Sequence, residues 1–175
     1  MVTATEPRRF PRVEYSGIYD FELLIEMIKT WFDERFYVRI NTEHTEAFKP
    51  QGRDIRIQMS PFKNVTPYVR YFIQFDMEFW REIDVMVKED GKQVKKQRGD
   101  MDFRFKAFFL KNFKQTFPSN KFGNFFRELY EKYIIKQELK NHEEQLREEV
   151  YELMDKVKEI LGLYKRKGDE VTIIQ

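Results

Sequence analysis

The sequence predicts an α+β fold in which an N-terminal helix and long C-terminal helices flank a curved antiparallel sheet of four to five strands. From about residue 35 to 111, apolar residues alternate with polar ones, which is the period of a half-buried strand. From about residue 120 to 164 they recur every three or four residues, which is the period of an amphipathic helix. A block of strands followed by a block of helices is typical of α+β domains.

The N-terminal region is predicted to hold an arm, a short edge strand and one helix. Residues 1–12 are polar and contain two prolines, so we expect a flexible arm, and residues 13–15 have the pattern of a short strand. The helix is predicted from about residue 20 to 34, with Asp20 as its N-cap. One apolar stripe at helical spacing is expected to cover the sheet. Its members are Phe21, Leu24, Ile25, Ile28 and Phe32.

The strand block has one apolar face throughout, which is typical of an antiparallel sheet that is covered on one side. Alternating patterns occupy residues 36–40, 55–59, 69–87 and 101–109, with turns predicted at 49–52, 90–91 and 99–100. The run at 69–87 is longer than an ordinary strand, so we expect a bulge near Trp80, Arg81 and Glu82. By analogy, the nearest architecture is a curved sheet that grips a helix, as in helix-grip or cystatin-like folds.

Two helical segments are predicted at the C-terminus. The first begins near residue 120 and has an apolar stripe of Phe122, Phe125, Phe126, Leu129 and Tyr133, which we expect to join the cover of the sheet. The second, at about 136–163, has a heptad-like pattern typical of a coiled coil. Its seam consists of Leu139, Leu146, Val150, Leu153, Val157 and Ile160. This seam could fold back on the sheet, pair with the preceding helix, or bind a second copy or a partner helix.

These elements define a domain organisation. Residues 13–118 form the helix and sheet core, residues 119–164 form helices that pack on the sheet or on a partner, and residues 165–175 form a tail. The sequence has no cysteine, which excludes disulfides, thiolate metal sites and cysteine nucleophiles. It also has no apolar run near the length of a membrane span, and its N-terminus does not resemble a signal peptide. We therefore expect a cytoplasmic protein and no membrane partner.

Catalytic motifs are missing from the sequence. No phosphate-binding glycine loop and no GxSxG elbow occurs, so we expect no enzyme, no metal and no cofactor. The weak candidates are His44 with Glu46, and Asp76 with Glu78, which share strand faces. Cross-strand ion pairing explains the second pair more simply. His142, beside the C-terminal seam, is interpreted as a seam-edge or surface residue.

Basic residues interleaved with phenylalanines give the clearest positive signal. Such a surface suits nucleic acid or anionic membrane surfaces, but the simpler interpretation is that the alternating phenylalanines are core residues and that the lysines mark a soluble edge strand. The predicted anionic-partner surface consists of Lys92, Lys95, Lys96, Arg98, Lys111, Lys114, Lys121, Lys165, Arg166 and Lys167. Because the whole chain has a net charge of only +2, this prediction rests on local clusters.

Three functional hypotheses follow from these residues. The first is a non-enzymatic interaction protein that binds a macromolecule, or a second copy of itself, through its outer sheet edge or its last helix. The second is an RNA- or ribosome-associated protein that uses the basic residues. The third is a carrier of a small apolar ligand in a phenylalanine-lined cavity between sheet and helix.

Three stretches of the sequence resemble small conserved proteins found in archaeal genomes. They are GIYDFELLIEMIKTWFDERFY, EDGKQVKKQRGDMDFRFKAFF and FFRELYEKYIIKQELKNHEEQLREEVYELMDKVKEILGLY. The resemblance covers most of residues 15–164 and rests on these stretches, without a catalytic motif. It implies an archaeal, cytoplasmic origin, and it transfers no activity and no site residue.

Overall fold

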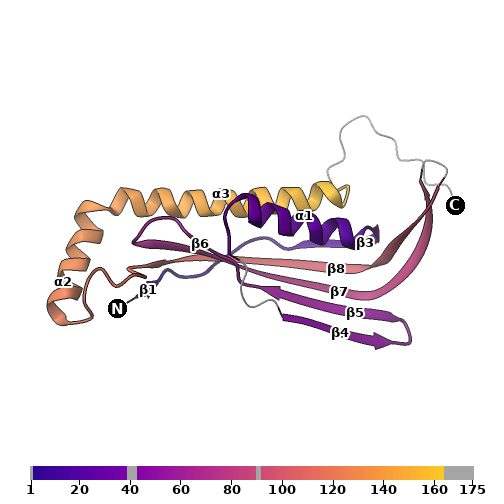
Figure 1. The fold of residues 1–175 in the computed structure, drawn as a ribbon, viewed down its shortest axis with the longest axis horizontal. Helices are drawn as coiled ribbons and strands as arrows, with labels where there is room; N and C mark the ends of the chain where they lie inside the picture. Colours follow the sequence, from indigo (N-terminus) through magenta and orange to yellow (C-terminus); the bar gives the residue numbers. More distant parts are fainter. Residues whose placement is uncertain (1, 39–42, 90–91, 164–175) are drawn as a thin grey trace.

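One curled antiparallel sheet is covered on one face by two helices, and a third helix stands at one end of the sheet (Figure 1). The computed structural model describes residues 2–38, 43–89 and 92–163. The predicted α+β class, the antiparallel sheet and the C-terminal helices are confirmed. The elements are β1 (Thr3–Ala4), β2 (Arg8–Arg9), β3 (Val13–Tyr19), α1 (Phe21–Glu34), β4 (Glu43–Lys49), β5 (Gly52–Met59), β6 (Phe62–Asn64), β7 (Val69–Glu89), β8 (Lys92–Lys111), α2 (Lys121–Leu129), the π-helical turn η1 (Tyr130–Ile134) and α3 (Lys136–Ile160).

The sheet has eight strands among the described residues, where the sequence predicted four to five. The difference arises because its outer positions are divided into short segments. β1, β2 and β3 follow one another along the free edge of β8, and Pro7 and Pro11 separate them. On the other side of β7, Pro61 separates β5 from β6. Proline has no N–H to donate to a ladder, so each one interrupts the pairing.

Helix α1 begins where the sequence predicted. Asp20 is the N-cap, and its Oδ1 accepts a hydrogen bond from the N–H of Leu23 at 2.9 Å. The predicted strand at 36–40 is wrong in its first part, because Phe36 has a φ of 60° and is exposed in the turn after the helix. Val38 forms a single bridge with Phe62, and residues 39–40 lie outside the described part of the chain.

The bulge predicted near Trp80, Arg81 and Glu82 is confirmed. The pairing of β7 with β8 shifts between Trp80 and Ile83, and Arg81 has a φ of 54°. The shift changes which side chains point inward, so that Glu82 is buried. Beyond the bulge, the β7–β8 hairpin turns away from the rest of the sheet (Figure 1).

Two glycines hold this bulge in place. A Cβ atom at Gly52 would lie 2.7 Å from the carbonyl carbon of Arg81, and one at Gly99 would lie 2.9 Å from the carbonyl oxygen of Trp80. Any larger residue at either position would collide with the backbone of the bulge. The predicted turn at 99–100 is therefore wrong: Gly99 lies inside the continuous strand β8, where it makes room for the neighbouring strand.

The other predicted turns have different outcomes. Lys49 pairs with Gly52 across a two-residue connection, which confirms the turn at 49–52. The turn at 90–91 lies outside the described residues, and Glu89 pairs with Lys92 on either side of it.

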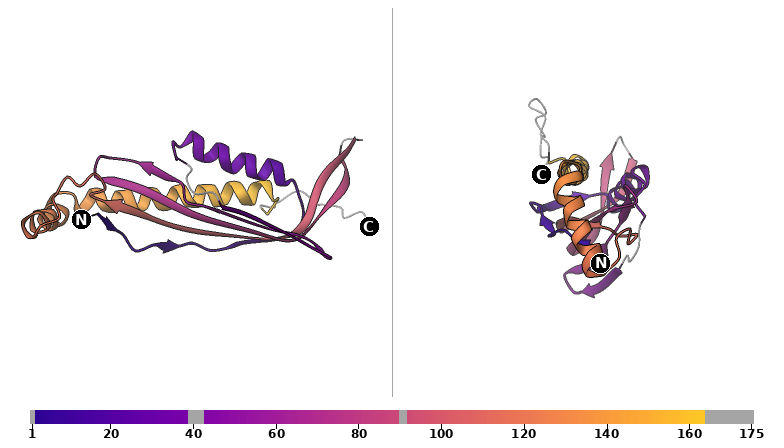
Figure 2. Two further views of the ribbon diagram at one scale, coloured as in Figure 1. Left: turned by 60° about the horizontal axis from the view of Figure 1, so that its bottom comes forward. Right: turned by 90° about the vertical axis from the view of Figure 1, so that its left-hand side faces the viewer.

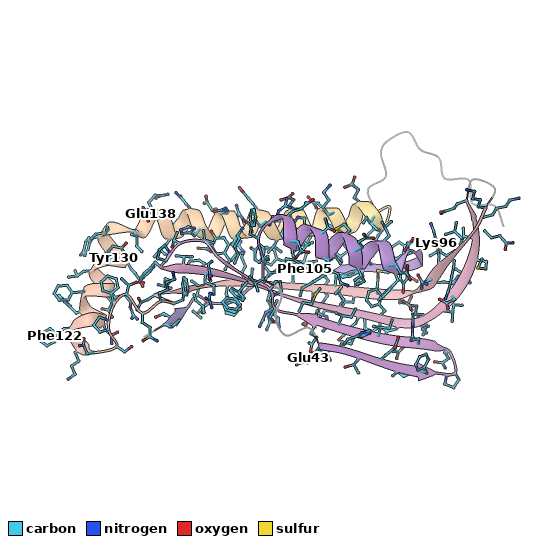
Figure 3. The ribbon with its side chains drawn as sticks, viewed as in Figure 1. Glu43, Lys96, Phe105, Phe122, Tyr130 and Glu138 are labelled. Carbon is cyan, nitrogen blue, oxygen red and sulfur yellow. The ribbon has the colours of Figure 1, made fainter. Side chains whose placement is uncertain are left out.

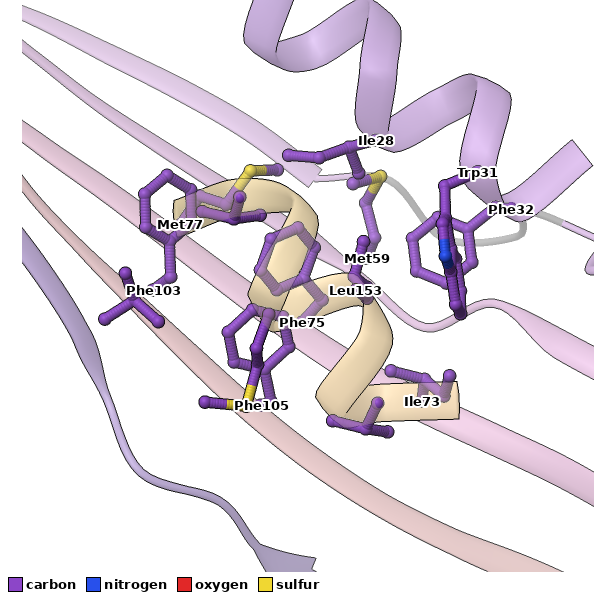
Figure 4. Close-up of a cluster of buried hydrophobic side chains, with 14 of the residues drawn as sticks. Ile28, Trp31, Phe32, Met59, Ile73, Phe75, Met77, Phe103, Phe105 and Leu153 are labelled. Carbon is purple, nitrogen blue, oxygen red and sulfur yellow. The ribbon is translucent and has the colours of Figure 1, made fainter. Parts of the chain in front are cut away.

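The inner face of the sheet forms the main core together with α1 and α3 (Figure 4). The rings of Phe75 and Phe105 stack with centroids 4.6 Å apart, and Phe103 lies 5.8 Å from Phe75. Ile28 of α1 and Leu153 of α3 close over them and are fully buried. The alternation of β7 and β8 thus produces the covered face that the sequence predicted.

Helix α2 lies elsewhere than predicted. It does not join the cover of the sheet but extends past one end of it, crosswise to α3 (Figures 1 and 2). The physical reason is length, since the 25 residues of α3 extend about 37 Å and the inward-facing run of β7, residues 69–79, extends about 36 Å. With α1 beside it, α3 covers the inner face and leaves α2 without a place there.

Candidate functional site

The apolar stripe of α2 and η1 is exposed. Its members have 39% to 77% of their surface accessible, where the sequence predicted core residues. We call this surface the aromatic face; it consists of Phe122, Phe125, Phe126, Leu129, Tyr133 and Ile134. With about 200 Å² for a fully exposed aromatic side chain, it exposes roughly 700 Å² of surface. Soluble monomers rarely expose apolar patches above roughly 300–600 Å², so this one indicates a binding surface.

The opposite side of α2 and η1 is anchored to the sheet. The ring of Tyr130 lies 5.7 Å from that of Tyr68 and 5.4 Å from that of Phe117. Glu131 accepts a hydrogen bond from the hydroxyl of Tyr68 at 2.6 Å and forms an ion pair with Lys111. These contacts fix which side of the helix turns outward. Figure 3 shows the result: Tyr130 lies toward the sheet and Phe122 points away from the body.

The loop before α2 is also fixed by specific contacts. Asn112 is fully buried, and its side-chain amide exchanges two hydrogen bonds of 3.1 Å with the backbone of Phe117. Asn120 caps the helix by accepting a hydrogen bond from the N–H of Gly123 at 2.6 Å, as the predicted start near residue 120 requires. A Cβ at Gly123 would lie 2.1 Å from the carbonyl oxygen of Pro118, so only glycine permits this approach. The position of the aromatic face is thus specified by the sequence.

A shallow apolar groove of about 670 Å³ lies along the aromatic face. Phe122, Phe126 and Tyr133 line it from the helix, and Phe117 and Pro118 line it from the preceding loop. Apolar side chains on opposite walls can contact an inserted apolar group on several sides. The groove is therefore suited to bulky apolar groups of a partner.

Basic residues outnumber acidic ones in the part of the chain that carries the aromatic face. Residues 111–140 contain seven basic and three acidic side chains, a net charge of +4, against +2 for the whole chain. Lys111 and Arg127 are paired with Glu131. Among the described residues, no carboxylate lies within ion-pair distance of the other five basic residues. They are Lys114, Lys121, Lys132, Lys136 and Lys140.

The predicted anionic-partner surface is divided between two places. Lys111, Lys114 and Lys121 lie near α2, whereas Lys92, Lys95, Lys96 and Arg98 lie at the far end of β8 (Figure 3). At that far end, Lys95 is paired with Asp84 at 2.9 Å, and Lys96 with Glu89. Lys165, Arg166 and Lys167 lie outside the described residues. The described members of the set therefore do not form one continuous surface.

The C-terminal seam is covered by the sheet of the same chain. Leu146, Val150, Leu153 and Val157 are buried, and Leu139 and Ile160 pack half-buried against the same core. The heptad-like spacing thus reflects docking on a sheet, and the coiled-coil interpretation receives no support. These side chains are not free to bind a partner helix.

A partly buried polar network joins α3 to the sheet. Glu149 accepts hydrogen bonds of 2.6 Å from both the hydroxyl of Tyr37 and the ammonium group of Lys63. Burial, followed by the nearby charge of Glu149, raises the pKa of Tyr37 far above its usual value. The hydroxyl of Tyr71 lies 2.8 Å from Nδ1 of His142. These polar groups satisfy one another inside the interface, which is a structural role.

The stability of the protein is expected to depend on pH through His142. Burial lowers the pKa of His142 below the ordinary value of 6.5, and the charge of Glu138 opposes this effect only in part. In acid, the unfolded chain therefore binds a proton more readily than the folded chain does. The free energy of unfolding should fall as the pH drops below about 6.5. Chemical denaturation between pH 5 and pH 8 measures the effect.

The matched variant for this prediction is His142→Gln, which has no titratable ring. Relative to the wild type, it should lose the part of the pH dependence that lies between the folded pKa and about 6.5. Identical pH profiles for the two proteins would contradict the assignment.

The weak catalytic candidates are held in ordinary sheet contacts. Glu78 pairs with Arg104 and with Arg56, as the ion-pair interpretation predicted, whereas Asp76 accepts a hydrogen bond from the neutral Gln58 at 2.9 Å. His44 lies exposed on β4. Within the described parts of the chain, no group of three or more histidine, aspartate or glutamate side chains is arranged to hold a metal ion.

Comparisons with known proteins add no information about the site. No protein-family model and no curated protein sequence matches the chain. An uncharacterised protein from Rhizobium leguminosarum has a solved structure with 12% sequence identity that covers 94% of this chain and 99% of its own. Its TM-score of 0.26 is too low to support an inference. Across residues 2–38, 43–89 and 92–163, no helix is both long and apolar enough to cross a membrane.

Proposed function

We propose that this protein is a non-enzymatic binding protein whose partner docks on the aromatic face of α2 and η1. The observation that carries the proposal is the exposure of Phe122, Phe125, Phe126 and Tyr133 on a helix whose other side is firmly anchored. Leaving this much apolar surface in water is unfavourable, at roughly 25 cal/mol per Å². A partner that covers the face recovers this free energy.

The contacts that anchor α2 and η1 support a binding function for the aromatic face, because they fix its exposed orientation. The buried Asn112, the glycine at 123 and the pairing of Glu131 with Lys111 all fix the inner side of α2 and η1, so that the aromatic face turns outward. A preorganised surface loses little conformational entropy when a partner binds, so more of the contact energy appears as affinity.

Site-specific cross-linking tests the proposal. Because the chain has no cysteine, a benzophenone attached to Phe125→Cys reports on the aromatic face alone. Phe48→Cys is the matched control, since Phe48 is also an exposed phenylalanine but lies on β4. In an extract of the source cells, we expect an adduct from position 125 and none from position 48. Excess unlabelled wild type should suppress the adduct.

The specificity control is the double variant Phe122→Glu/Phe126→Glu. Both side chains are exposed, so the variant should keep the wild-type thermal unfolding while failing to suppress the adduct. Equal adducts from positions 125 and 48, or suppression by the double variant, would contradict the proposal.

Two alternatives keep specific support. RNA binding would rest on the unpaired lysines near α2, and it predicts an adduct that contains nucleic acid and weakens steeply with salt. Binding of a small apolar ligand would rest on the groove of about 670 Å³ at α2, because the inner-face rings of Phe75 and Phe105 already pack against each other. The helix-grip analogy, in which ligands lie between sheet and helix, would instead place such a ligand in the core.

A further inference from the structure

We infer that the partner of the aromatic face is the surface of an anionic lipid bilayer, on which α2 and η1 lie as an interfacial helix. The inference rests on the proposed function and names the partner. An interfacial helix combines an apolar face rich in aromatic residues with basic residues at its margin, and it lies in the plane of the headgroups. The segment from Lys121 to Ile134 has both properties.

The position of α2 in the fold permits this contact. Viewed end-on, α2 is the element nearest the reader, and nothing in the described chain stands in front of it (Figure 2). Because α2 lies crosswise at the end of the molecule, its outward face can meet a plane along its whole length. Phe122 points away from the body toward such a plane (Figure 3).

The charges around the face favour an anionic surface. Lys121 and Lys132 belong to the helical segment itself, and Lys114 and Lys136 flank it, all four without a carboxylate partner among the described residues. Glu131 is paired with Lys111, and the exposed Glu128 and Glu138 oppose the attraction only in part. Each basic side chain near an anionic bilayer adds to the electrostatic attraction.

The same charges disfavour a second copy as the occupant. Packing two aromatic faces together by a twofold axis would bring the four unpaired lysines of each copy close to one another. Only Glu128 and Glu138 on each copy could offset them. An apolar face with a basic rim is better matched to apolar chains beneath phosphate and carboxylate headgroups.

The depth of insertion is limited by the anchoring contacts. Tyr130, Phe117 and Tyr68 hold the inner side of the helix against the sheet, so only the outer side chains can enter the lipid. The contact is therefore peripheral, at the boundary between headgroups and acyl chains. This agrees with the observation that no described helix could cross a bilayer.

Vesicle flotation with the full chain tests the inference. Vesicles of phosphatidylcholine alone are compared with vesicles that contain about one third phosphatidylserine. We expect the anionic vesicles to bind at least about tenfold more tightly, with the advantage lost at high salt. Phe122→Glu/Phe126→Glu and Lys121→Glu/Lys132→Glu should each weaken binding at least about tenfold.

Control variants carry the same kinds of substitution, at single positions, at the opposite end. Phe48→Glu and Lys88→Glu change an exposed phenylalanine and an exposed lysine far from α2, and they should leave binding unchanged. A nitrobenzoxadiazole dye on Phe125→Cys should shift its emission to the blue on anionic vesicles, and the same dye on Phe48→Cys should not. This readout reports insertion directly, so a folding defect cannot imitate it.

The outcomes separate this inference from the proposed function. Failure to bind anionic vesicles, together with a specific protein or RNA adduct from position 125, would overturn the lipid inference and leave the binding function standing. Failure of both experiments would overturn both. Equal binding to neutral and anionic vesicles, unaffected by the lysine variant, would overturn the anionic selectivity.

Discussion

Replacing Leu153 with alanine is expected to lower the free energy of unfolding by about 3–4 kcal/mol. Leu153 is fully buried between α3 and the phenylalanine-rich face of the sheet, so the substitution leaves a cavity. Urea denaturation followed by circular dichroism measures the loss. The result bears on function because it shows whether the seam of α3 packs against its own chain and is therefore unavailable to a partner.

The matched control is Leu129→Ala, the same substitution on the aromatic face. Leu129 is 39% exposed on α2, and its truncation should cost less than about 1 kcal/mol. Equal losses for the two variants would mean that α2 is packed as tightly as α3. That result would contradict the assignment of α3 as a helix docked on the sheet and of α2 as a helix with an exposed apolar face.

Removing the carboxylate of Glu82 should cost about 3 kcal/mol, which is the second large effect. Glu82 is buried at the bulge, where it accepts a hydrogen bond of 2.8 Å from the hydroxyl of Tyr19 and forms an ion pair with Arg53. In Glu82→Ala the Tyr19 hydroxyl loses its acceptor. Arg53 keeps Glu46 at 3.0 Å and is partly exposed, which limits the loss. Chemical denaturation measures the difference.

Two further variants make this prediction specific. Tyr19→Phe removes one hydrogen bond and should cost about 1 kcal/mol. Glu89→Ala, on the exposed end of the same strand, removes only a surface pair with Lys96 and should cost less than about 1 kcal/mol. If Glu82→Ala were as mild as Glu89→Ala, the bulge would not depend on this buried pair.

The sequence predicted the elements with strong local signals. Asp20 and Asn120 cap their helices as expected, because N-cap chemistry depends on only three or four neighbouring residues. The bulge near Arg81 was predictable because an alternating run that exceeds an ordinary strand must bend. In both cases the decisive interactions lie within a few residues of chain.

The errors concern features that depend on distant partners. Gly99 was predicted as a turn because glycine favours turns, but its role is to accommodate the backbone of Trp80 from another strand. The stripe of α2 was predicted as core because helical periodicity shows that a face is apolar and does not show what covers it. Ile134 was missed because the π-helical turn η1 changes the spacing after Tyr130.

The sequence thus predicted only part of the candidate site. Lys114 and Lys121, interleaved with phenylalanines, were predicted as part of an anionic-partner surface, and they lie beside the aromatic face. The sequence could not separate them from Lys95 and Lys96, which lie at the opposite end and are paired with acidic residues. The apolar residues of α2 and those of α3 recur at the same helical spacing. In the structure, those of α2 are exposed and those of α3 are buried.

Thiol accessibility in the free protein shows directly whether the aromatic face is open to a partner. Single cysteines replace Phe125, Phe48 and Leu153, and their rates of reaction with a water-soluble thiol reagent are compared. We expect cysteine at 125 to react about as fast as the exposed control at 48, and cysteine at 153 to be protected by about two orders of magnitude or more. Protection at 125 equal to that at 153 would contradict the claim that the aromatic face is open to a partner.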